Sequence, residues 1–226
     1  LLPSFDTAPD TYRTTGFAAW GTELWCFVGT YPYQWDWTNK SWLRKTRWAT
    51  VGTPLGHNGT LYEGWVVVPT WLAADDTPDD YYWKSSAGDT WAKASGTPPK
   101  FKYFAVADNK LWGANKGGSS EHHVQSCTDP TAGTNWAAAT AIGTSDAEIT
   151  GLLSDGTTLL VCKTDGIWTL ASDGTVKHLL DMRANQHPHN LRSAVYWQGP
   201  GWFILAPGTP GLLKLIGSEV TPIAFN

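Results

Sequence analysis

The chain has 226 residues, enough for one large all-β domain or for two smaller ones. A net charge of −4 with only 16 lysines and arginines excludes the clustered cations of a nucleic-acid-binding surface. Charged residues make up 16% of the chain, against 23 glycines, 14 prolines and 15 tryptophans, which favours turns and short strands over long solvated helices.

Three cysteines, Cys26, Cys127 and Cys162, are widely spaced and include no C-x-x-C motif. We therefore expect them to be buried small hydrophobic residues, with no disulfide framework. No apolar run approaches the roughly 18 residues that a membrane span needs, so no membrane span is predicted. The chain begins at Leu1 without a signal-like segment, and we expect a processed product or part of a longer chain.

A first structural unit is expected over residues 16–49, and its distinctive stretch is YPYQWDWTNKSW at residues 31–42. Four aromatic residues alternate there and share one face if the stretch is a strand: Tyr31, Tyr33, Trp35 and Trp37. Sugar rings stack on such aromatic faces, and Gln34, Asp36 and Asn39 offer hydrogen bonds. We predict these four aromatic residues as ligand-binding; the alternative is that the face packs against the next unit.

A second unit is expected over residues 50–100, with two further ligand-binding candidates, Trp71 and Trp83, beside an insertion at residues 70–83. The insertion contains DDTPDD at residues 75–80, whose four carboxylates suit a hard cation. It lacks the spacing and the glycine of a dedicated calcium loop, so a solvated hairpin tip is the favoured interpretation and no metal site is predicted.

A third unit is expected over residues 101–147. His122 and His123 are neighbours, and in an extended strand they point to opposite faces, so we do not expect them to share a metal ion. GANKGGSS at residues 113–120 precedes no helix that could hold a phosphate, so it predicts a loop and no nucleotide cofactor. TNWAAATAIG at residues 134–143 is predicted to be an edge strand.

The last two units are expected over residues 148–189 and 190–226. Three Asp-Gly pairs, at residues 155–156, 165–166 and 173–174, are strong signals for tight hairpin turns. The predicted strands are 149–154, 158–163, 167–171 and 175–180, then 191–197, 202–206, 211–216 and 219–224. HPH at residues 187–189 is interpreted as a proline-stiffened turn, with metal binding as the less favoured alternative.

Two sequence markers recur with a period of about 45 residues. A pair of apolar or aromatic residues is predicted to open each second strand, at positions 24–25, 61–62, 111–112, 159–160 and 202–203. The last strand of each unit is marked by Trp42, Trp91, Trp136, Val176 and Val220. A four-stranded unit with this period predicts a β-propeller of about five blades in a single domain, residues 1–226. Two β-sandwiches or a β-solenoid are the alternatives.

Four stretches resemble known propeller repeats. SSAGDTW (85–91) and SCTDPTAGTNW (126–136) are similar to degenerate Asp-box (BNR-like) hairpins, in which Gly88 and Gly133 correspond to the turn glycine and Trp91 and Trp136 to the packing tryptophan. Ala87 stands where that family has its aspartate. LLVCKTDGIWTLASDGTVKHLL (159–180) and GLLKLIGSEVTPIAF (211–225) resemble propeller repeats of virion and tail proteins of tailed bacteriophages.

Sialidases share the Asp-box hairpin, so the resemblance raises a sialidase-like enzyme as an alternative. A sialidase-like site needs an arginine cluster, a tyrosine nucleophile with a glutamate base, and an aspartic acid. This chain has five scattered arginines, and no tyrosine is visibly paired with a glutamate. We therefore expect no enzyme activity, and a sialidase-like glycoside hydrolase is the least favoured alternative.

The phage resemblance implies a virion-associated propeller in the tail or on the capsid surface, with a structural, adhesive or host-recognition role. Its partners are expected to be other virion proteins, copies of itself, or cell-surface glycans. The alternative is a secreted carbohydrate-binding lectin-like propeller. A lectin with one sugar pocket per blade repeats its pocket residues, whereas the aromatic residues differ between the first and fourth units.

Overall fold

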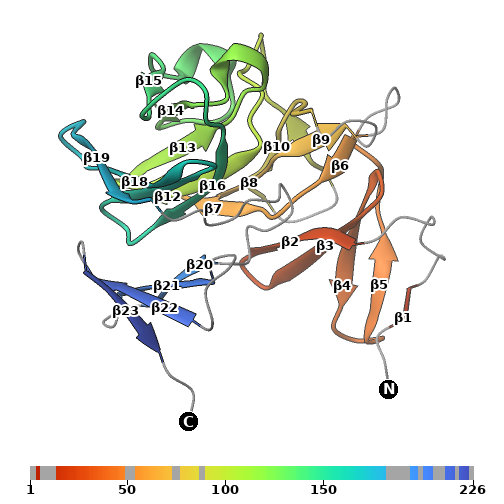
Figure 1. The fold of residues 1–226 in the computed structure, drawn as a ribbon. Helices are drawn as coiled ribbons and strands as arrows, with labels where there is room; N and C mark the ends of the chain where they lie inside the picture. Colours follow the sequence, from red (N-terminus) through yellow and green to blue (C-terminus); the bar gives the residue numbers. More distant parts are fainter. Residues whose placement is uncertain are drawn as a thin grey trace. The chain divides into compact units, whose positions relative to one another are not determined.

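The computed structural model describes residues 4–5, 14–48, 54–72, 77–86, 90–181, 194–197, 201–205, 212–216 and 219–223. These residues form β-strands and two 3-10 turns, η1 (Gly118–Ser120) and η2 (Gly133–Asn135). Five sheets of four or five strands and one two-stranded sheet are present among them (Figure 1). The all-β prediction is confirmed, and none of the helices in this part of the chain is long and apolar enough to cross a membrane.

The chain divides into two compact units. The first comprises Leu1–Phe104 and Asp129–Trp136, and the second comprises Ala105–Thr128 and Ala137–Asn226. The single domain over residues 1–226, its blade boundaries and the closed ring stay predictions.

Sheet 1 lies in the first unit and contains the aromatic stretch (Figure 1). Its strands, in spatial order, are β1 (Ser4–Phe5), β5 (Ser41–Arg44), β4 (Tyr31–Asp36), β3 (Glu23–Val28) and β2 (Thr14–Trp20). Strands β2 to β5 form an antiparallel meander, because each connection is a short turn. Strand β1 extends the outer edge by pairing in parallel with Ser41 and Trp42.

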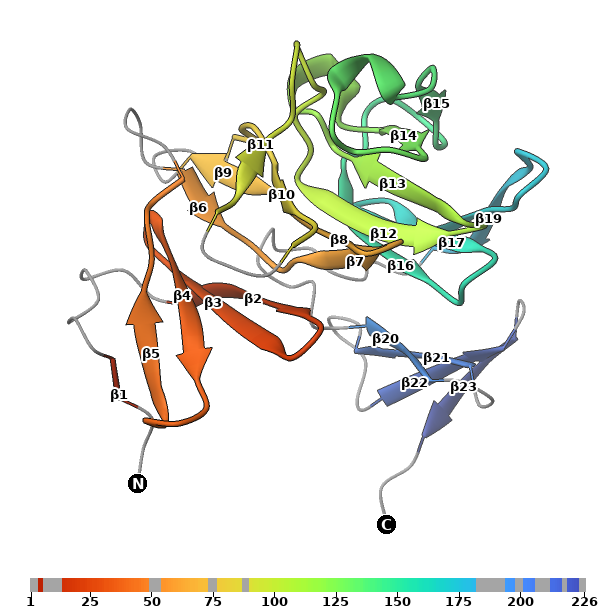
Figure 2. The ribbon, with the colours of Figure 1, turned by 180° about the vertical axis from the view of Figure 1, so that it is seen from behind.

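Sheet 2 also lies in the first unit. Its strands are β7 (Thr60–Tyr62), β8 (Trp65–Val68), β10 (Tyr82–Lys84) and β11 (Ala92–Lys93). Strands β6 (Pro54–Gly56) and β9 (Thr70–Leu72) pair separately (Figure 2). The prediction that Leu61-Tyr62 opens a second strand is wrong, because this pair ends the first strand. The hairpin turn is Glu63-Gly64, where both residues have positive φ, 43° and 87°.

Asn58-Gly59 has the sequence of a tight turn, but in the structure these residues pack sheet 1 against sheet 2. A Cβ atom on Gly59 would lie 2.6 Å from the Cβ of Ala18, so only glycine permits this approach. The backbone N–H of Gly59 donates to the Phe17 carbonyl (2.9 Å), and the Phe17 N–H donates to Asn58 Oδ1 (3.1 Å). The two sheets are thus joined by backbone contacts as well as by side chains.

One face of sheet 1, called the covered face, is buried in this contact. Its residues are Ala18, Trp20, Trp25 and Phe27. They pack with Val66 and Val68 of sheet 2 and with Trp48 and Trp91. The ring of Trp25 meets Trp91 edge to face at 5.3 Å, and Phe27 lies 5.0 Å from Trp48. These aromatic contacts build the core of the first unit.

A buried ion pair joins the same two sheets. Lys84 Nζ lies 3.1 Å from Glu23 Oε2 and donates to the Ser86 carbonyl at 2.6 Å. The rings of Trp20 and Trp25 lie 5.3 and 5.2 Å from the same ammonium, within cation–π range. Glu23 also accepts a hydrogen bond from Trp25 Nε1 (3.0 Å). Lys84 is therefore a cation enclosed by carboxylate, carbonyl and two indoles.

The segment Asp129–Trp136 completes the core of the first unit. Tyr81 donates its hydroxyl proton to the Pro130 carbonyl (2.7 Å) and accepts one from Trp136 Nε1 (2.9 Å). The Trp136 ring packs on Phe101 at 4.6 Å and on Phe104 at 6.1 Å. Trp136 precedes the last strand of its sheet by four residues, so its predicted place inside that strand is wrong.

The second unit contains most of sheet 3 and all of sheets 4 and 5 (Figure 2). The strands of sheet 3 are β12 (Tyr103–Ala107), β13 (Lys110–Ala114), β14 (His123–Cys127) and β15 (Thr140–Ala141). The edge strand predicted at residues 134–143 is confined to β15. The residues before it form η2 and an irregular stretch, because Thr131 and Gly133 exchange backbone hydrogen bonds with Ser95 and Asn135 Nδ2 donates to the Asp129 carbonyl.

Sheets 4 and 5 follow the predicted strands closely. Sheet 4 comprises β16 (Ile149–Ser154), β17 (Leu159–Lys163), β18 (Gly166–Leu170) and β19 (Val176–Leu180). Sheet 5 comprises β20 (Ala194–Trp197), β21 (Gly201–Leu205), β22 (Leu212–Ile216) and β23 (Glu219–Ile223). Leu160, Cys162 and Ile167 of sheet 4 pack with Trp202 and Leu215 of sheet 5. The three cysteines are buried, as predicted.

The turns between the third and fourth strands of three sheets share one device. A carboxylate accepts the backbone N–H two residues ahead: Asp36 from Thr38 (2.7 Å), Asp129 from Thr131 (2.8 Å) and Asp173 from Thr175 (2.8 Å). This side-chain turn fixes the hairpin without requiring a glycine at every position. The corresponding turn of sheet 2 includes residues 87–89, which lie outside the described residues.

Candidate functional site

The face of sheet 1 opposite the covered face, called the aromatic face, is the strongest candidate for a functional surface. Cross-strand pairing aligns Phe17 with Cys26, Cys26 with Tyr33, and Trp35 with Trp42. Directly paired residues project from the same side of a sheet. The aromatic face therefore consists of Phe17, Ala19, Leu24, Cys26, Val28, Tyr31, Tyr33, Trp35, Trp42 and, at the hairpin tip, Trp37.

Burial varies steeply across the aromatic face. Cys26, Val28 and Tyr33 form a buried floor with Trp42, and Tyr31 and Trp35 pack against that floor half-buried. Trp37 and Phe17, by contrast, remain 57% and 45% exposed. Burial raises the pKa of the Cys26 thiol, against a weak hydrogen bond to Thr14 that lowers it. The edge of this face thus offers large apolar rings to a ligand, while its centre is closed.

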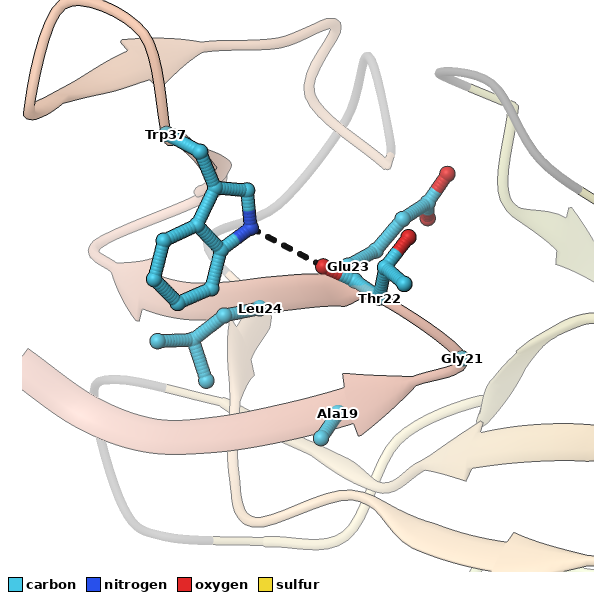
Figure 3. A pocket seen from close by; sticks show the side chains of 6 residues that line it. All are labelled: Ala19, Gly21, Thr22, Glu23, Leu24 and Trp37. Carbon is cyan, nitrogen blue, oxygen red and sulfur yellow. Dashed lines mark hydrogen bonds between the residues drawn. The ribbon is translucent and has the colours of Figure 1, made fainter.

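Trp37 is held in a fixed orientation by two turns at the same end of the sheet. Its Nε1 donates to the Thr22 carbonyl in the β2–β3 turn at 3.0 Å (Figure 3). Its own hairpin is fixed by Asp36, which accepts from the Asn39 side chain (2.7 Å) and from two backbone N–H groups. The Asn39 side chain, then the backbone N–H groups of Asn39 and Thr38, lower the pKa of Asp36. An exposed indole that is already ordered loses little entropy on binding.

A pocket of about 490 Å³ opens beside Trp37. It is lined by Ala19, Gly21, Thr22, Glu23, Leu24 and Trp37. The indole stands beside Leu24, whereas Ala19 lies on the neighbouring strand and the Glu23 carboxylate points away from the indole (Figure 3). That carboxylate is committed to Lys84 and Trp25. The surface presented by the pocket is therefore mainly carbon and suits an apolar group.

The predicted ligand-binding residues separate into two groups. Tyr31, Tyr33, Trp35 and Trp37 lie together on the aromatic face, as their alternation indicates. Trp71 is fully buried in β9, stacked on His57 at 3.7 Å, and its Nε1 donates to the Lys102 carbonyl. Trp83 is half-buried in β10. Ligand binding by these six residues stays a prediction, with Trp37 the most exposed of them.

Sequence reasoning missed Phe17, Leu24 and Lys40 at this site. Phe17 and Leu24 come from strands that are neighbours of the aromatic stretch only after the sheet has formed. Lys40 Nζ lies 5.7 Å from the centre of the Trp37 ring. A signal for it was present, because a basic residue three positions after an exposed hairpin tryptophan reaches the same ring.

The histidine pair and the acidic insertion give no assembled metal site among the described residues. His122 and His123 have ring centres 3.9 Å apart, closer than expected, because β14 begins only at His123. Burial, then His122 and Lys116, lower the pKa of His123. Asp79 and Asp80 pair with Lys100 and Lys93. Within the described part of the chain no three metal-binding side chains cluster; residues 75–76 and 187–189 lie outside it.

Lys163 is a second buried lysine, in the second unit. Its ammonium donates to the carbonyls of Ile142 (2.7 Å) and Thr144 (2.9 Å) and lies 3.6 Å from Asp165. Burial lowers the pKa of Lys163, while Asp165 opposes that shift. The carbonyls and the carboxylate account for its donors, so this lysine pins the loop at residues 142–144.

Comparison with known proteins identifies a fold. No protein-family model matches the chain. No curated protein matches its sequence. Among solved structures, the tricorn protease is similar at a TM-score of 0.55 and 13% identity, covering 95% of this chain and 23% of that one. The extracellular domain of the one-component system protein BT4673 from B. thetaiotaomicron is similar at 0.61 and 12%, covering 85% and 26%.

This chain spans about a quarter of the length of those solved chains. At this level of identity the similarity concerns the fold and not the activity. Together with the small four-stranded sheets, it gives the conclusion that the protein has an all-β, β-propeller-like fold.

Proposed function

We propose that the chain is a non-enzymatic, virion-associated β-propeller of a bacteriophage that acts by docking, as a structural or adhesion subunit of the tail or capsid surface. The observation that carries the docking role is the aromatic face of sheet 1, with Trp37 held in place and exposed. The virion assignment rests on the similarity of residues 159–180 and 211–225 to phage propeller repeats.

The polar groups around Trp37 favour a protein partner over a glycan. Sugar binding requires hydrogen-bonding side chains that converge on the aromatic platform. The side chains of Asp36 and Asn39 are hydrogen-bonded within their own turn. Gln34 pairs with Trp25 across the strands and therefore lies on the opposite face. A carbon-lined pocket beside a fixed indole suits an apolar protein side chain, as in the centre of protein–protein interfaces.

Electron microscopy of the purified native assembly tests this proposal. We expect the propeller at regular positions on a tail or capsid, with the aromatic face of sheet 1 against a neighbouring subunit. Trp37→Ala protein is expected to be excluded from particles when it competes with wild-type protein during assembly. Leu61→Ala, which alters another exposed apolar residue (57% exposed, in sheet 2), is the matched control and should be incorporated normally.

Two outcomes would overturn the proposal. One is native material in which the protein occurs only as a separate particle-free molecule; a glycan array on that material then tests the lectin alternative. The other is equal incorporation of Trp37→Ala and wild-type protein, because the aromatic face would then play no part in assembly.

A further inference from the structure

The hairpin that carries the aromatic face is the most basic part of a weakly acidic chain. Residues 31–48 contain four cations, Lys40, Arg44, Lys45 and Arg47, and one carboxylate, Asp36, a net charge of +3. The whole chain has a net charge of −4. This local concentration of positive charge coincides with the exposed aromatic rings.

Two of these cations lie directly against the aromatic face. Lys40 Nζ is 5.7 Å from the centre of the Trp37 ring, and the Arg44 guanidinium carbon is 4.9 Å from the centre of the Tyr31 ring. Both side chains belong to exposed residues of the β4–β5 hairpin. Glu23 belongs to the pocket lining, but its carboxylate is paired with Lys84 on the other side of the sheet. Because Tyr31 begins β4 and Trp37 follows its end, Arg44 lies at the far end of the aromatic face from the pocket. Lys40 is the cation at the pocket rim, and the pocket walls are mainly apolar.

We propose that the occupant of the Trp37 pocket is an acidic segment of a partner protein, with an aromatic side chain seated between Trp37 and Leu24. A carboxylate flanking that side chain meets Lys40. The inference rests on the docking role proposed above and names the chemistry of the partner. It follows from complementarity: an apolar pocket selects the ring, and a cationic rim selects the sign of the flanking charges.

Three short peptides test the aromatic ring and the flanking charges separately: acetyl-Asp-Trp-Asp-amide, acetyl-Lys-Trp-Lys-amide and acetyl-Asp-Ala-Asp-amide. Binding is followed by fluorine NMR of the whole chain labelled with 5-fluorotryptophan, with the Trp37 resonance assigned from Trp37→Phe protein. We expect Asp-Trp-Asp to bind about tenfold more tightly than either other peptide and to shift the Trp37 resonance. Its affinity is expected to fall as sodium chloride is raised from about 0.05 M to about 0.5 M.

Matched variants show which residues determine the affinity for each peptide. Lys40→Gln is expected to weaken Asp-Trp-Asp binding about threefold and to leave Lys-Trp-Lys binding unchanged or slightly stronger. Lys177→Gln removes an exposed lysine from β19 and should change neither affinity. Trp37→Ala is expected to abolish binding of Asp-Trp-Asp, whereas Leu61→Ala leaves it intact. The unfolding midpoint of each variant confirms that it is folded.

The inference is overturned if Lys-Trp-Lys binds as tightly as Asp-Trp-Asp, or if the peptides shift other tryptophans but not Trp37. It is also overturned if sedimentation shows concentration-dependent self-association that Trp37→Ala abolishes and Asp-Trp-Asp does not compete with, because the occupant is then a second copy. Particles in which the aromatic face contacts a basic segment would refute the inference and leave the docking role standing. Particle-free native protein that still binds Asp-Trp-Asp would refute the virion role alone.

Discussion

The two faces of sheet 1 are made of similar residues and meet different surroundings. Trp25 and Phe27 on the covered face are fully buried against Val66, Val68 and the rings of Trp48 and Trp91. On the aromatic face, Trp37 and Phe17 present about half of their surface to solvent. The comparison shows that aromatic content does not by itself mark a core or a ligand site. The deciding factor is whether another sheet covers the ring.

The largest expected effect is a difference in the free energy of unfolding between substitutions on the covered face and on the aromatic face. Trp25→Ala is expected to lower the free energy of unfolding by about 3–5 kcal/mol, because it leaves a cavity in a packed contact between two sheets. Trp37→Ala is expected to cost less than about 1 kcal/mol, because the ring is exposed and has one hydrogen bond to lose. Urea unfolding of both variants measures the difference. Equal losses would mean that the aromatic face is as fully packed as the covered face.

The next largest effect on the free energy of unfolding is expected for the buried Lys84–Glu23 ion pair. Lys84→Met is expected to cost about 3 kcal/mol, because it leaves the Glu23 carboxylate without its cation in a poorly solvated site. Adding Glu23→Gln to Lys84→Met should recover part of that loss. Lys100→Met breaks an exposed pair with Asp79 and should cost less than about 1 kcal/mol. Equal effects of Lys84→Met and Lys100→Met in urea unfolding would contradict a buried role for Lys84.

A substitution at Lys40 is expected to raise the free energy of unfolding and to lower the affinity for Asp-Trp-Asp. Its φ is +54°, a left-handed conformation that costs a non-glycine residue energy. Lys40→Gly is therefore expected to raise the free energy of unfolding by about 0.5–1 kcal/mol, after the greater freedom of glycine in the unfolded chain is subtracted. The same variant loses the rim cation and should bind Asp-Trp-Asp more weakly.

Lys40→Gln keeps the strain and removes only the charge, so its stability should match that of the wild type. A parallel fall in the stability and binding of Lys40→Gly would show that the turn geometry, and not the charge, positions Trp37.

The smallest effect is a local dependence on pH. The pKa of Asp36 lies below its ordinary value of 3.8, because the carboxylate accepts hydrogen bonds within the hairpin. The stabilisation is complete above the unfolded value and is lost as the pH falls through the lower folded value. Acid is therefore expected to shift the Trp37 fluorine resonance before that of Trp25. Asp36→Ala should abolish this early shift, and simultaneous changes of both resonances would contradict it.

Local signals predicted much of the fold. The Asp-Gly turns placed β16 to β19 within about one residue, because such a turn specifies both its conformation and the register of its strands. The prediction failed in sheet 2, where Asn58-Gly59 is a stronger turn signal than Glu63-Gly64. Gly59 is required there by contact with Ala18, a contact that no local pattern contains.

The candidate site was predicted in part for the same reason. Alternation correctly grouped Tyr31, Tyr33 and Trp35, and the same rule places Gln34 on the opposite face, away from any ligand that they bind. The burial of Tyr33 and the exposure of Trp37 depend on neighbouring strands and on the hairpin tip. The contact of Lys40 with Trp37 depends on a left-handed turn residue that period-two reasoning does not include.

The segment Asp129–Trp136 has a consequence for the order in which the protein matures. Phe101, Phe104 and Tyr81 precede it in the chain, yet Trp136 and the Pro130 carbonyl complete their surroundings. During synthesis on the ribosome, the first unit therefore has to wait with these rings incompletely enclosed until residue 136 has left the exit tunnel. The interval between the emergence of residue 104 and that of residue 136 from the tunnel thus sets how long a nascent, aggregation-prone surface is accessible to chaperones.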